Sequence, residues 1–190
     1  MDQTRPGSLG GVPIAFVLDV DGVMTDGRSV YTEAGKVQKV FGPDDHDALC
    51  LLRETLDIHF VSGDRRGFPI SAARIERDMG FPIEAVSSID RLAWIGARWS
   101  AEQVIYMGDG IYDHLVFRGV GYGICVADGD ADARAEADYV TVRRGGDRAV
   151  AEACKHIMDL FFGGRQRFFE AAQVGRGPAV AGDWSSRATA

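Results

Sequence analysis

Short apolar segments alternate along the chain with segments whose apolar residues recur at helical spacing. The first pattern predicts strands at 13–18, 57–61, 83–86, 103–107, 122–127 and 137–142. The second predicts helices near 46–56, 69–79, 88–99, 111–119 and 147–162. Most strand segments are apolar throughout, as expected when helices cover both faces of a sheet. The alternation predicts an α/β fold, a Rossmann-like doubly wound parallel sheet flanked by helices.

One segment departs from this pattern. Residues 28–41, RSVYTEAGKVQKVF, alternate between apolar and polar positions on both sides of EAGK, which predicts a β-hairpin. We expect this hairpin to project beyond the sheet as a small flap in place of a cap domain. The predicted organisation is a flexible N-terminus over 1–12, one domain over 13–162, and a flexible tail over 163–190, which is rich in Gly, Arg, Ala and Ser.

Composition narrows the class of protein. The 190 residues carry a net charge of -7 and show no basic stripe, which argues against a nucleic-acid partner. No apolar run approaches the roughly 18 residues that span a bilayer, so no membrane partner is expected. Cys50, Cys125 and Cys154 lie among apolar residues and are predicted to be buried thiols in a reducing compartment. We therefore expect a cytoplasmic protein.

Polar motifs follow three of the predicted strands. DVDG, with Asp19 and Asp21, follows the first strand; SGD (62–64) follows the second; GDGIYD (108–113) follows the fourth. In an open parallel sheet, ligands bind outside the carboxyl ends of the strands. These motifs, distant in sequence, are therefore predicted to meet in one crevice.

Four acids of this crevice are candidate metal ligands: Asp19, Asp21, Asp109 and Asp113. Carboxylates gathered this closely repel one another unless a cation lies among them. Ligation by oxygen alone suits a hard cation, and Mg²⁺ in particular binds one or two carboxylates together with a substrate phosphate. The sequence therefore predicts a Mg²⁺ site.

Further residues are candidates for binding a phosphate or the rest of a substrate. Ser62 and Gly63, at a strand-to-helix turn, would offer a hydroxyl and backbone N–H groups to phosphate oxygens. Arg91, after the third strand, would neutralise charge on a transferring phosphoryl group. Asp26 either forms a turn before the hairpin or lines the pocket.

Taken in chain order, DVDG, SGD, Arg91 and GDGIYD resemble the four motifs of the haloacid-dehalogenase superfamily of phosphohydrolases. That resemblance implies that Asp19 attacks phosphorus to form an aspartyl-phosphate, and that Asp21 protonates the leaving oxygen and later activates water. It also implies Mg²⁺ held by Asp19, the backbone carbonyl of Asp21 and Asp109, with Asp113 in support. The dehalogenases of the superfamily lack the second acid of D-x-D, so Asp21 favours phosphate chemistry.

A narrower resemblance covers about residues 13 to 162. DVDGVMTDG, the hairpin and ADYVTVRRGGDRAVAEACKHI (137–157) are similar to the 3-deoxy-octulosonate 8-phosphate and nonulosonate 9-phosphate phosphatases. They also resemble the phosphatase-like domain attached to some acylneuraminate cytidylyltransferases. The resemblance implies a sugar phosphate substrate. It also implies a homotetramer built through the hairpin, in which a neighbouring subunit covers each active site.

The chain departs from this subfamily at positions that would face the substrate. Its SGD places Asp64 where Ser/Thr-Gly-Arg has the arginine, and Arg91 stands where lysine is more usual. FGPDDHDAL (41–49) replaces an Arg-Asp-Gly-x-Gly segment, and GDG (108–110) replaces GDD. Because the catalytic acids are intact, we expect the same reaction on a different sugar phosphate, octulosonate-, nonulosonate- or heptose-like.

Other interpretations stay open on the sequence alone. The acids around His46 (44–47) either cap a helix or contact sugar hydroxyls, with capping favoured. Arg143 and Arg144 are either surface charges or reach a phosphate across a subunit boundary. The rival functions are a catalytically silent oligomerisation domain and a phosphotransferase that passes the phosphoryl group to an acceptor other than water.

Overall fold

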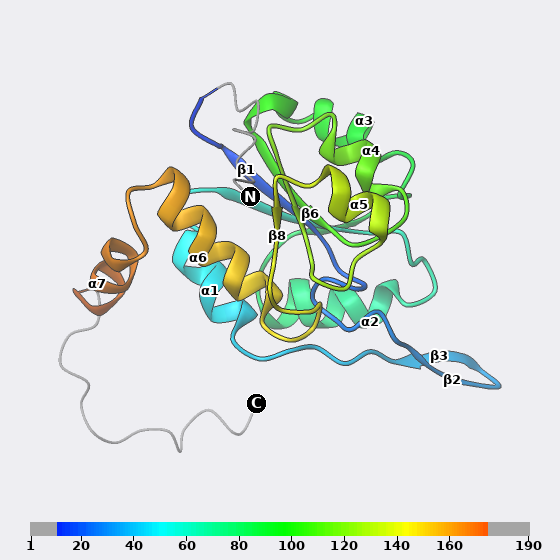
Figure 1. The fold of residues 1–190 in the computed structure, drawn as a ribbon. Helices are drawn as coiled ribbons and strands as arrows, with labels where there is room; N and C mark the ends of the chain where they lie inside the picture. Colours follow the sequence, from blue (N-terminus) through cyan, green and yellow to red (C-terminus); the bar gives the residue numbers. More distant parts are fainter. Residues whose placement is uncertain (1–10, 175–190) are drawn as a thin grey trace, which may run out of the picture.

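The structure, a computed structural model, describes residues 11–174 and centres on a parallel six-stranded sheet (Figure 1). The strands run in the order β5 (Ile83–Ala85), β4 (Asp57–Ser62), β1 (Ala15–Asp19), β6 (Val104–Gly108), β7 (Tyr122–Cys125) and β8 (Tyr139–Val140). Every residue of β1 and β6 is buried. The predicted α/β fold is confirmed, and all six predicted strands form.

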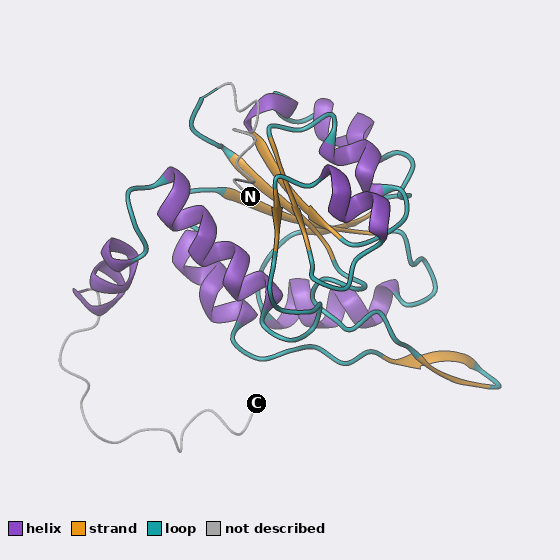
Figure 2. Ribbon diagram, viewed as in Figure 1, coloured by secondary structure: helices purple, strands orange, loops and turns teal. Residues whose placement is uncertain are grey.

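Helices cover both faces of this sheet (Figure 2). On one face lie α1 (Asp45–Leu52), α2 (Phe68–Ala72) and α6 (Ala149–Phe161); on the other lie α3 (Arg91–Gly96), α4 (Asp113–Phe117) and α5 (Ala131–Glu136). Because successive side chains of a strand point to opposite faces, Phe16 and Leu18 of β1 enter the first core and Ala15 and Val17 the second. Two buried layers thus fix the central strands.

Strand register determines where the chemistry lies. β1 pairs in parallel with β4 on one side and β6 on the other, with Asp19 beside Val61 and Leu18 beside Met107. The carboxyl ends of these three strands therefore reach the same edge of the sheet. The residues that follow each strand meet there, as the motif positions predict.

Some elements differ from the sequence prediction. The helix predicted at 69–79 is α2 followed by a π-helical segment, η1 (Ala73–Asp78), and a short 3-10 turn, η2 (Ala101–Gln103), precedes β6. The sequence pattern did not predict α5. A further helix, α7 (Gln166–Val174), forms within the segment predicted as a flexible tail and contacts α1. The remainder of that tail, 175–190, and residues 1–10 lie outside the described residues.

The predicted hairpin forms from β2 (Val30–Thr32) and β3 (Gly35–Gln38) and extends away from the sheet (Figure 1). An isolated bridge between Thr25 and Phe41 joins the chain at its base. Its apolar side chains are exposed, Tyr31 by 60% and Val40 by 57%. Across residues 11–174, no helix combines the length and apolar character needed to cross a membrane.

Candidate active site

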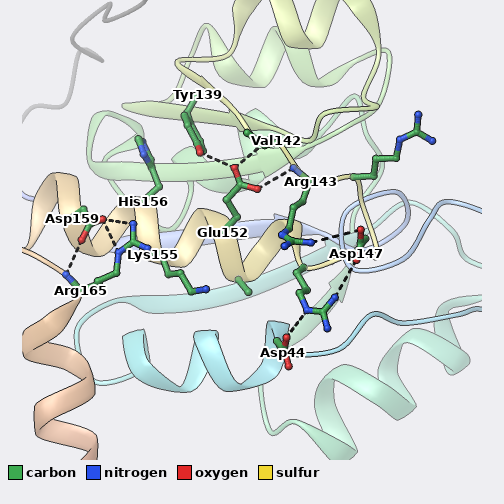
Figure 3. A pocket seen from close by; sticks show the side chains of 13 residues that line it. Asp44, Tyr139, Val142, Arg143, Asp147, Glu152, Lys155, His156, Asp159 and Arg165 are labelled. Carbon is green, nitrogen blue, oxygen red and sulfur yellow. Dashed lines mark hydrogen bonds and ion pairs between the residues drawn. The ribbon is translucent and has the colours of Figure 1, made fainter.

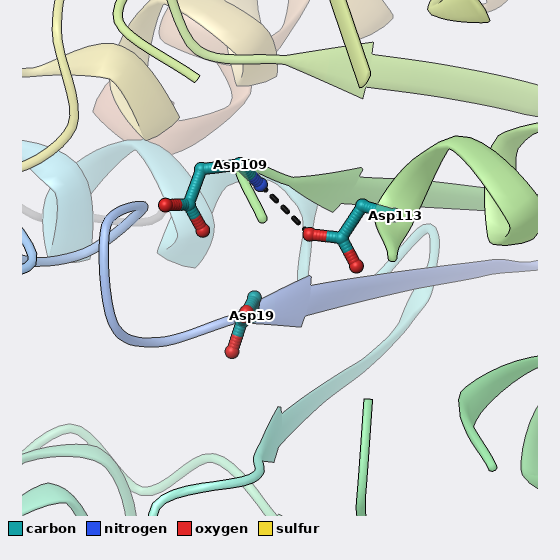
Figure 4. A group of neighbouring side chains, drawn as sticks. All are labelled: Asp19, Asp109 and Asp113. Atoms are coloured by element: carbon teal, nitrogen blue, oxygen red, sulfur yellow. Dashed lines mark hydrogen bonds between the residues drawn. The ribbon is translucent and has the colours of Figure 1, made fainter. Parts of the chain in front are cut away.

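Three carboxylates meet where neighbouring strands end (Figure 4). Asp19 is the last residue of β1, Asp109 directly follows β6, and Asp113 begins α4 after a short turn. One oxygen of each carboxylate lies within 4.8 Å of the other two. The structure therefore brings together three of the four acids predicted as metal ligands.

The guanidinium of Arg91 lies among these acids and is 3% exposed. Its Nη1 donates to Asp19 Oδ2 at 2.7 Å, to Asp113 Oδ1 at 3.0 Å and to the hydroxyl of Tyr106 at 2.6 Å. Burial alone would lower the pKa of Arg91, but Tyr106, Asp19 and Asp113 raise it overall, so the guanidinium stays charged. Arg91 is thus the charge that compensates the buried acids.

Asp113 is fully occupied by hydrogen bonds. Its Oδ2 accepts the N–H groups of Asp109 at 2.9 Å and Gly110 at 2.8 Å, while Oδ1 accepts from Tyr106 at 2.8 Å and from Arg91. The carboxylate therefore holds the turn after β6 in shape. That arrangement suits support of a metal ligand better than direct ligation.

Asp109 is different, because no hydrogen-bond donor among residues 11–174 reaches its carboxylate oxygens. Burial, together with the charges of Asp19 and Asp113, raises its pKa to about 8. Burial also raises the pKa of Asp19 to about 6, although Arg91 acts in the opposite direction. This part of the site carries more buried negative charge than Arg91 offsets.

A hard divalent cation fits that excess of charge. The donors are oxygens, two of the carboxylates have raised pKa values, and Asp109 has no other partner within the described chain. Such a donor set matches Mg²⁺, which accepts carboxylate oxygens and keeps positions for water and phosphate. The cofactor of this site is Mg²⁺, as the sequence predicts.

The loop after β1 needs a glycine beside this site. Gly22 has φ 86, and a Cβ at this position would lie 1.9 Å from Asp109 Oδ2. Both the backbone conformation and the close approach exclude a larger residue. The glycine of DVDG therefore allows the loop to pass directly beneath the acid.

Asp21, the fourth predicted acid, does not join the group of three. Its carboxylate contacts Lys39 Nζ at 2.7 Å and accepts from the hydroxyl of Ser62 at 3.3 Å. Ser62 is buried at the end of β4 and also accepts the N–H of Asp64 at 3.2 Å, while Gly63 between them is exposed. The predicted phosphate-binding turn therefore lies beside Asp21.

Three residues around Asp21 and Arg91 were not predicted from the sequence as site residues: Lys39, Ser71 and Tyr106. Asp64 is paired with Lys36 and Lys39, which hold its pKa well below the usual range although burial acts in the opposite direction. Tyr106 is hidden within an apolar strand, and only its hydroxyl belongs to the polar network. Nothing in the sequence pattern distinguishes Lys36 and Lys39 from the other polar residues of an exposed hairpin.

The structure places Asp26 outside the network of acids. Asp26 is exposed, and its Oδ1 accepts the N–H of Arg28 at 3.0 Å, which is the hydrogen bond of a tight turn. Of the two interpretations left open by the sequence, this geometry favours the turn before the hairpin.

The acids at 44–47 lie at the start of α1, and two of them also contact the start of α6. Asp44 stands at the N-cap position of α1 without a capping hydrogen bond, and its carboxylate accepts from Arg148 Nε at 2.5 Å. Asp45 is buried and accepts the N–H of Ala151, near the start of α6, at 2.8 Å. The helix thus begins among these acids, with Asp45 and Asp47 in its first turn, as the favoured interpretation predicts, but no side-chain capping hydrogen bond forms at Asp44.

Arg143 and Arg144 line a separate groove of about 780 Å³ beside α6 (Figure 3). Several of its charges pair with one another: Arg143 lies 3.9 Å from Asp147, and Arg165 Nε donates to Asp159 at 2.8 Å. Glu152 accepts the N–H groups of Val142 and Arg143. The pairing of Arg143 with Asp147 favours the interpretation of Arg143 as a surface charge.

The fold and the acidic edge together define a class, the phosphoryl-transferring hydrolases of the α/β type. A profile of the haloacid dehalogenase-like hydrolases matches residues 91–153. The 3-deoxy-D-manno-octulosonate 8-phosphate phosphatase KdsC of Yersinia pestis is 30% identical over 150 residues, which cover 75% of this chain and 78% of that protein. The chain belongs to the haloacid dehalogenase-like hydrolase family and, within it, to the phosphoric monoester hydrolases.

Solved structures agree with this placement. The 3-deoxy-D-manno-octulosonate 8-phosphate phosphatase of Moraxella catarrhalis, in complex with a magnesium ion, a phosphate ion and a KDO molecule, has a TM-score of 0.71 at 25% identity, covering 86% of this chain and 94% of that chain. The cobalt-bound phosphatase of Haemophilus influenzae has a TM-score of 0.66 at 28% identity, covering 77% and 88%. Both resemble this chain over most of the described fold.

Proposed function

We propose that this protein is a Mg²⁺-dependent phosphomonoesterase that hydrolyses a sugar phosphate through an aspartyl-phosphate on Asp19. The observation that carries the proposal is the meeting of Asp19, Asp109 and Asp113 around Arg91 at the carboxyl edge of the sheet. Asp109, partly buried and without a hydrogen-bond donor among residues 11–174, supports the metal requirement. The catalytic domain spans residues 13–162, with the hairpin as its insertion.

In the first half of the reaction, a carboxylate oxygen of Asp19 forms a bond to phosphorus as the bond from phosphorus to the sugar oxygen breaks. Asp21 donates its proton to that departing oxygen. Val20 N–H donates to Asp19 Oδ1 at 2.7 Å and Arg91 donates to Oδ2, so the nucleophile is held in one orientation. This half releases the sugar and leaves the phosphoryl group on Asp19.

In the second half, Asp21 accepts a proton from a water molecule as the oxygen of that water bonds to phosphorus. The bond between phosphorus and Asp19 breaks, and inorganic phosphate leaves. The starting protonation state of both acids is restored, so the cycle balances without another reactant.

Other residues handle the phosphoryl charge. Ser62 and Gly63 bind phosphate oxygens through a hydroxyl and backbone N–H groups, and the Arg91 guanidinium offsets the charge that develops in transfer. Asp19, the Asp21 carbonyl and Asp109, with Asp113 in support, would hold Mg²⁺, which would reduce the repulsion between carboxylate and phosphate. Asp26 serves as a turn residue.

The substrate class rests on the relatives. The relatives from Yersinia pestis and Escherichia coli are 3-deoxy-D-manno-octulosonate 8-phosphate phosphatases, and this chain is 30% identical to them. Asp64, where the resembling subfamily has arginine, changes the charge beside Asp21, so we propose an octulosonate-, nonulosonate- or heptose-like sugar phosphate other than that one. A cytoplasmic location stays a prediction, supported by the free thiols of Cys50, Cys125 and Cys154.

The hairpin supports a homo-oligomer, a tetramer by resemblance. Val30, Tyr31, Val37 and Val40 are 48–60% exposed on this small element, which has no core of its own. Light scattering of the wild type and of Val37→Asp tests this: an oligomer that dissociates in the variant supports the proposal, and a monomeric wild type contradicts it.

The function is tested by phosphate release from a panel of sugar phosphates: 3-deoxy-octulosonate 8-phosphate, a nonulosonate 9-phosphate, sedoheptulose 7-phosphate and glucose 6-phosphate. Wild type and Asp19→Asn are compared in Mg²⁺ and in EDTA. We expect release that requires Mg²⁺ and falls by at least about three orders of magnitude in Asp19→Asn, because the nucleophile is lost.

Two other outcomes would each support one of the rival functions. If no phosphate is released and Asp19→Asn behaves as wild type, the silent oligomerisation domain replaces this proposal. If adding a sugar acceptor yields a new phosphorylated sugar at the expense of phosphate, the protein is a phosphotransferase.

A further inference from the structure

Lys39 is the one buried residue between positions 28 and 40, in a hairpin whose other residues are exposed or partly exposed. Its side chain is 0% exposed. A lysine is almost never fully buried unless it is paired, because removing an ammonium group from water is costly. The position of Lys39 therefore depends on its partners.

Those partners come from three other segments of the chain. Lys39 Nζ lies 2.7 Å from Asp21 Oδ1 and donates to Asp21 Oδ2 at 2.8 Å. It also donates to the hydroxyl of Ser71 in α2 at 2.9 Å and pairs with Asp64, after β4, at 2.9 Å. An ammonium group has three hydrogens, and three partners use them fully.

The proton-transferring carboxylate is thus held from the hairpin side. Asp21 is 27% exposed at its side chain, so one part of it faces the open crevice while Lys39 and Ser62 contact it from the protein. A carboxyl group gripped in this way keeps a fixed direction toward a bound leaving group.

We propose that Lys39 is a positioning residue that acts through Asp21 to assist departure of the sugar oxygen. The inference rests on the proposed function and deepens it, since it explains why the hairpin extends a buried side chain back into the site of its own subunit. Because Asp21, Asp64 and Ser71 occupy the Lys39 ammonium group, its effect on the reaction passes through Asp21.

The test uses two leaving groups that differ in their need for a proton. A sugar oxygen is a poor leaving group and needs protonation, whereas 4-nitrophenolate leaves without it. The value of kcat/KM reports steps up to release of the leaving group, so the later action of Asp21 on water does not enter. We compare kcat/KM for the best member of the sugar phosphate panel with that for 4-nitrophenyl phosphate.

For Lys39→Met we expect kcat/KM on the sugar phosphate to fall about 100-fold, the scale of general acid catalysis, and on 4-nitrophenyl phosphate by less than about 10-fold. Lys39→Arg should recover part of the loss. The double variant Asp21→Asn/Lys39→Met should be no slower than Asp21→Asn, because residues that act as one unit are not additive. Equal losses on both substrates, or additive losses in the double variant, would overturn the inference.

Two further variants separate this role from folding. Ser71→Ala removes a neutral partner of Lys39 without leaving a charge unpaired, so it should fold and show the same selective loss at smaller size. Lys36→Met is the matched control: Lys36 pairs with Asp64 but not with Asp21, so the ratio between the two substrates should stay at the wild-type value. A changed ratio in Lys36→Met, or an unchanged ratio in Ser71→Ala, contradicts action through Asp21.

Failure of this inference is distinguishable from failure of the proposed function. If the wild type releases phosphate and Asp19→Asn does not, the phosphatase function stands whatever Lys39→Met does. If the wild type releases no phosphate from either kind of substrate, both fail together.

Discussion

Two regions of the molecule bury carboxylates, and they treat them in different ways. At the carboxyl edge of the sheet, Asp19 and Asp113 share a buried guanidinium, and Asp113 accepts four hydrogen bonds. Between α1 and α6, Asp45 is 1% exposed, accepts the N–H of Ala151 through Oδ1, and leaves Oδ2 without a partner in residues 11–174. One region is a charged network, and the other is a single buried acid that forms no ion pair within residues 11–174.

The difference indicates what each acid does. A network in which one guanidinium offsets two acids and leaves Asp109 uncompensated is arranged for a cation and an anionic substrate. Asp45 supplies an acceptor to the N-terminus of α6, where Arg148 at the cap position offers none. Asp45 is buried where α1 packs against α6, and its ionisation there lowers the stability of the folded state.

The largest expected effect is from Arg91→Met, which leaves Asp19 and Asp113 buried without their cation. Removing one partner of a buried ion pair costs about 3–5 kcal/mol of unfolding free energy. Urea denaturation measures this loss, and Arg91→Lys should recover part of it because the charge returns. A stability of Arg91→Met equal to wild type would mean that the acids do not depend on the guanidinium.

The next prediction concerns the stability of Asp109→Asn relative to wild type, which should differ in sign with and without metal. The pKa of Asp109 is raised to about 8, so its ionisation costs stability that increases as pH rises from about 4 to 8. In EDTA at pH 8, Asp109→Asn should therefore be more stable than wild type by about 2 kcal/mol. This difference is smaller than the free energy that corresponds to the whole pKa shift, because the carboxylate is only partly buried and water screens its charge.

In Mg²⁺ the order should change, because the ion binds the folded wild type and Asp109→Asn lacks a ligand. A wild-type Tm that rises with Mg²⁺ while that of Asp109→Asn stays constant is the expected thermal-shift result. Equal rises in both proteins would remove Asp109 from the metal site.

Asp45 should give a smaller, metal-independent effect. Burial raises its pKa to about 6, so the folded state holds this proton more tightly than the unfolded chain does. Stability from this group is therefore lost as pH rises through about 4 to 6. Between pH 5 and pH 8 the wild type should lose about 1 kcal/mol relative to Asp45→Asn, measured by urea denaturation at both pH values. A difference that does not change with pH would show that Asp45 keeps an ordinary pKa.

An exposed carboxylate provides the baseline for the comparison. Asp78 pairs with Arg74 one helical turn away, and its side chain is 62% exposed. Asp78→Asn should change the unfolding free energy by less than about 0.5 kcal/mol at any pH from 5 to 8. A larger change would mean that the effects at Asp45 and Asp109 are not specific to burial.

The same contrast explains what the sequence could predict. Asp19, Asp109, Asp113, Ser62 and Arg91 follow or begin elements with clear apolar patterns, so strand register alone places them at one edge. Lys39 was not predicted, because alternation marks its hairpin as exposed and no local signal indicates that one side chain turns inward. Asp45 was assigned to its own helix, because only the packing of α1 against α6 shows which N–H groups it meets. Helix α5 carries too few apolar residues for its period to stand out.

The central claim, that Asp19 accepts the phosphoryl group, is tested most directly without knowing the sugar. Beryllofluoride with Mg²⁺ mimics a phosphoryl group on a carboxylate, so we would measure the Tm of wild type and Asp19→Asn with and without it. The account predicts a rise of roughly 5–10 °C in the wild type at saturation and none in Asp19→Asn, with Asp78→Asn responding as wild type. An equal rise in Asp19→Asn, or no rise in the wild type, would contradict it.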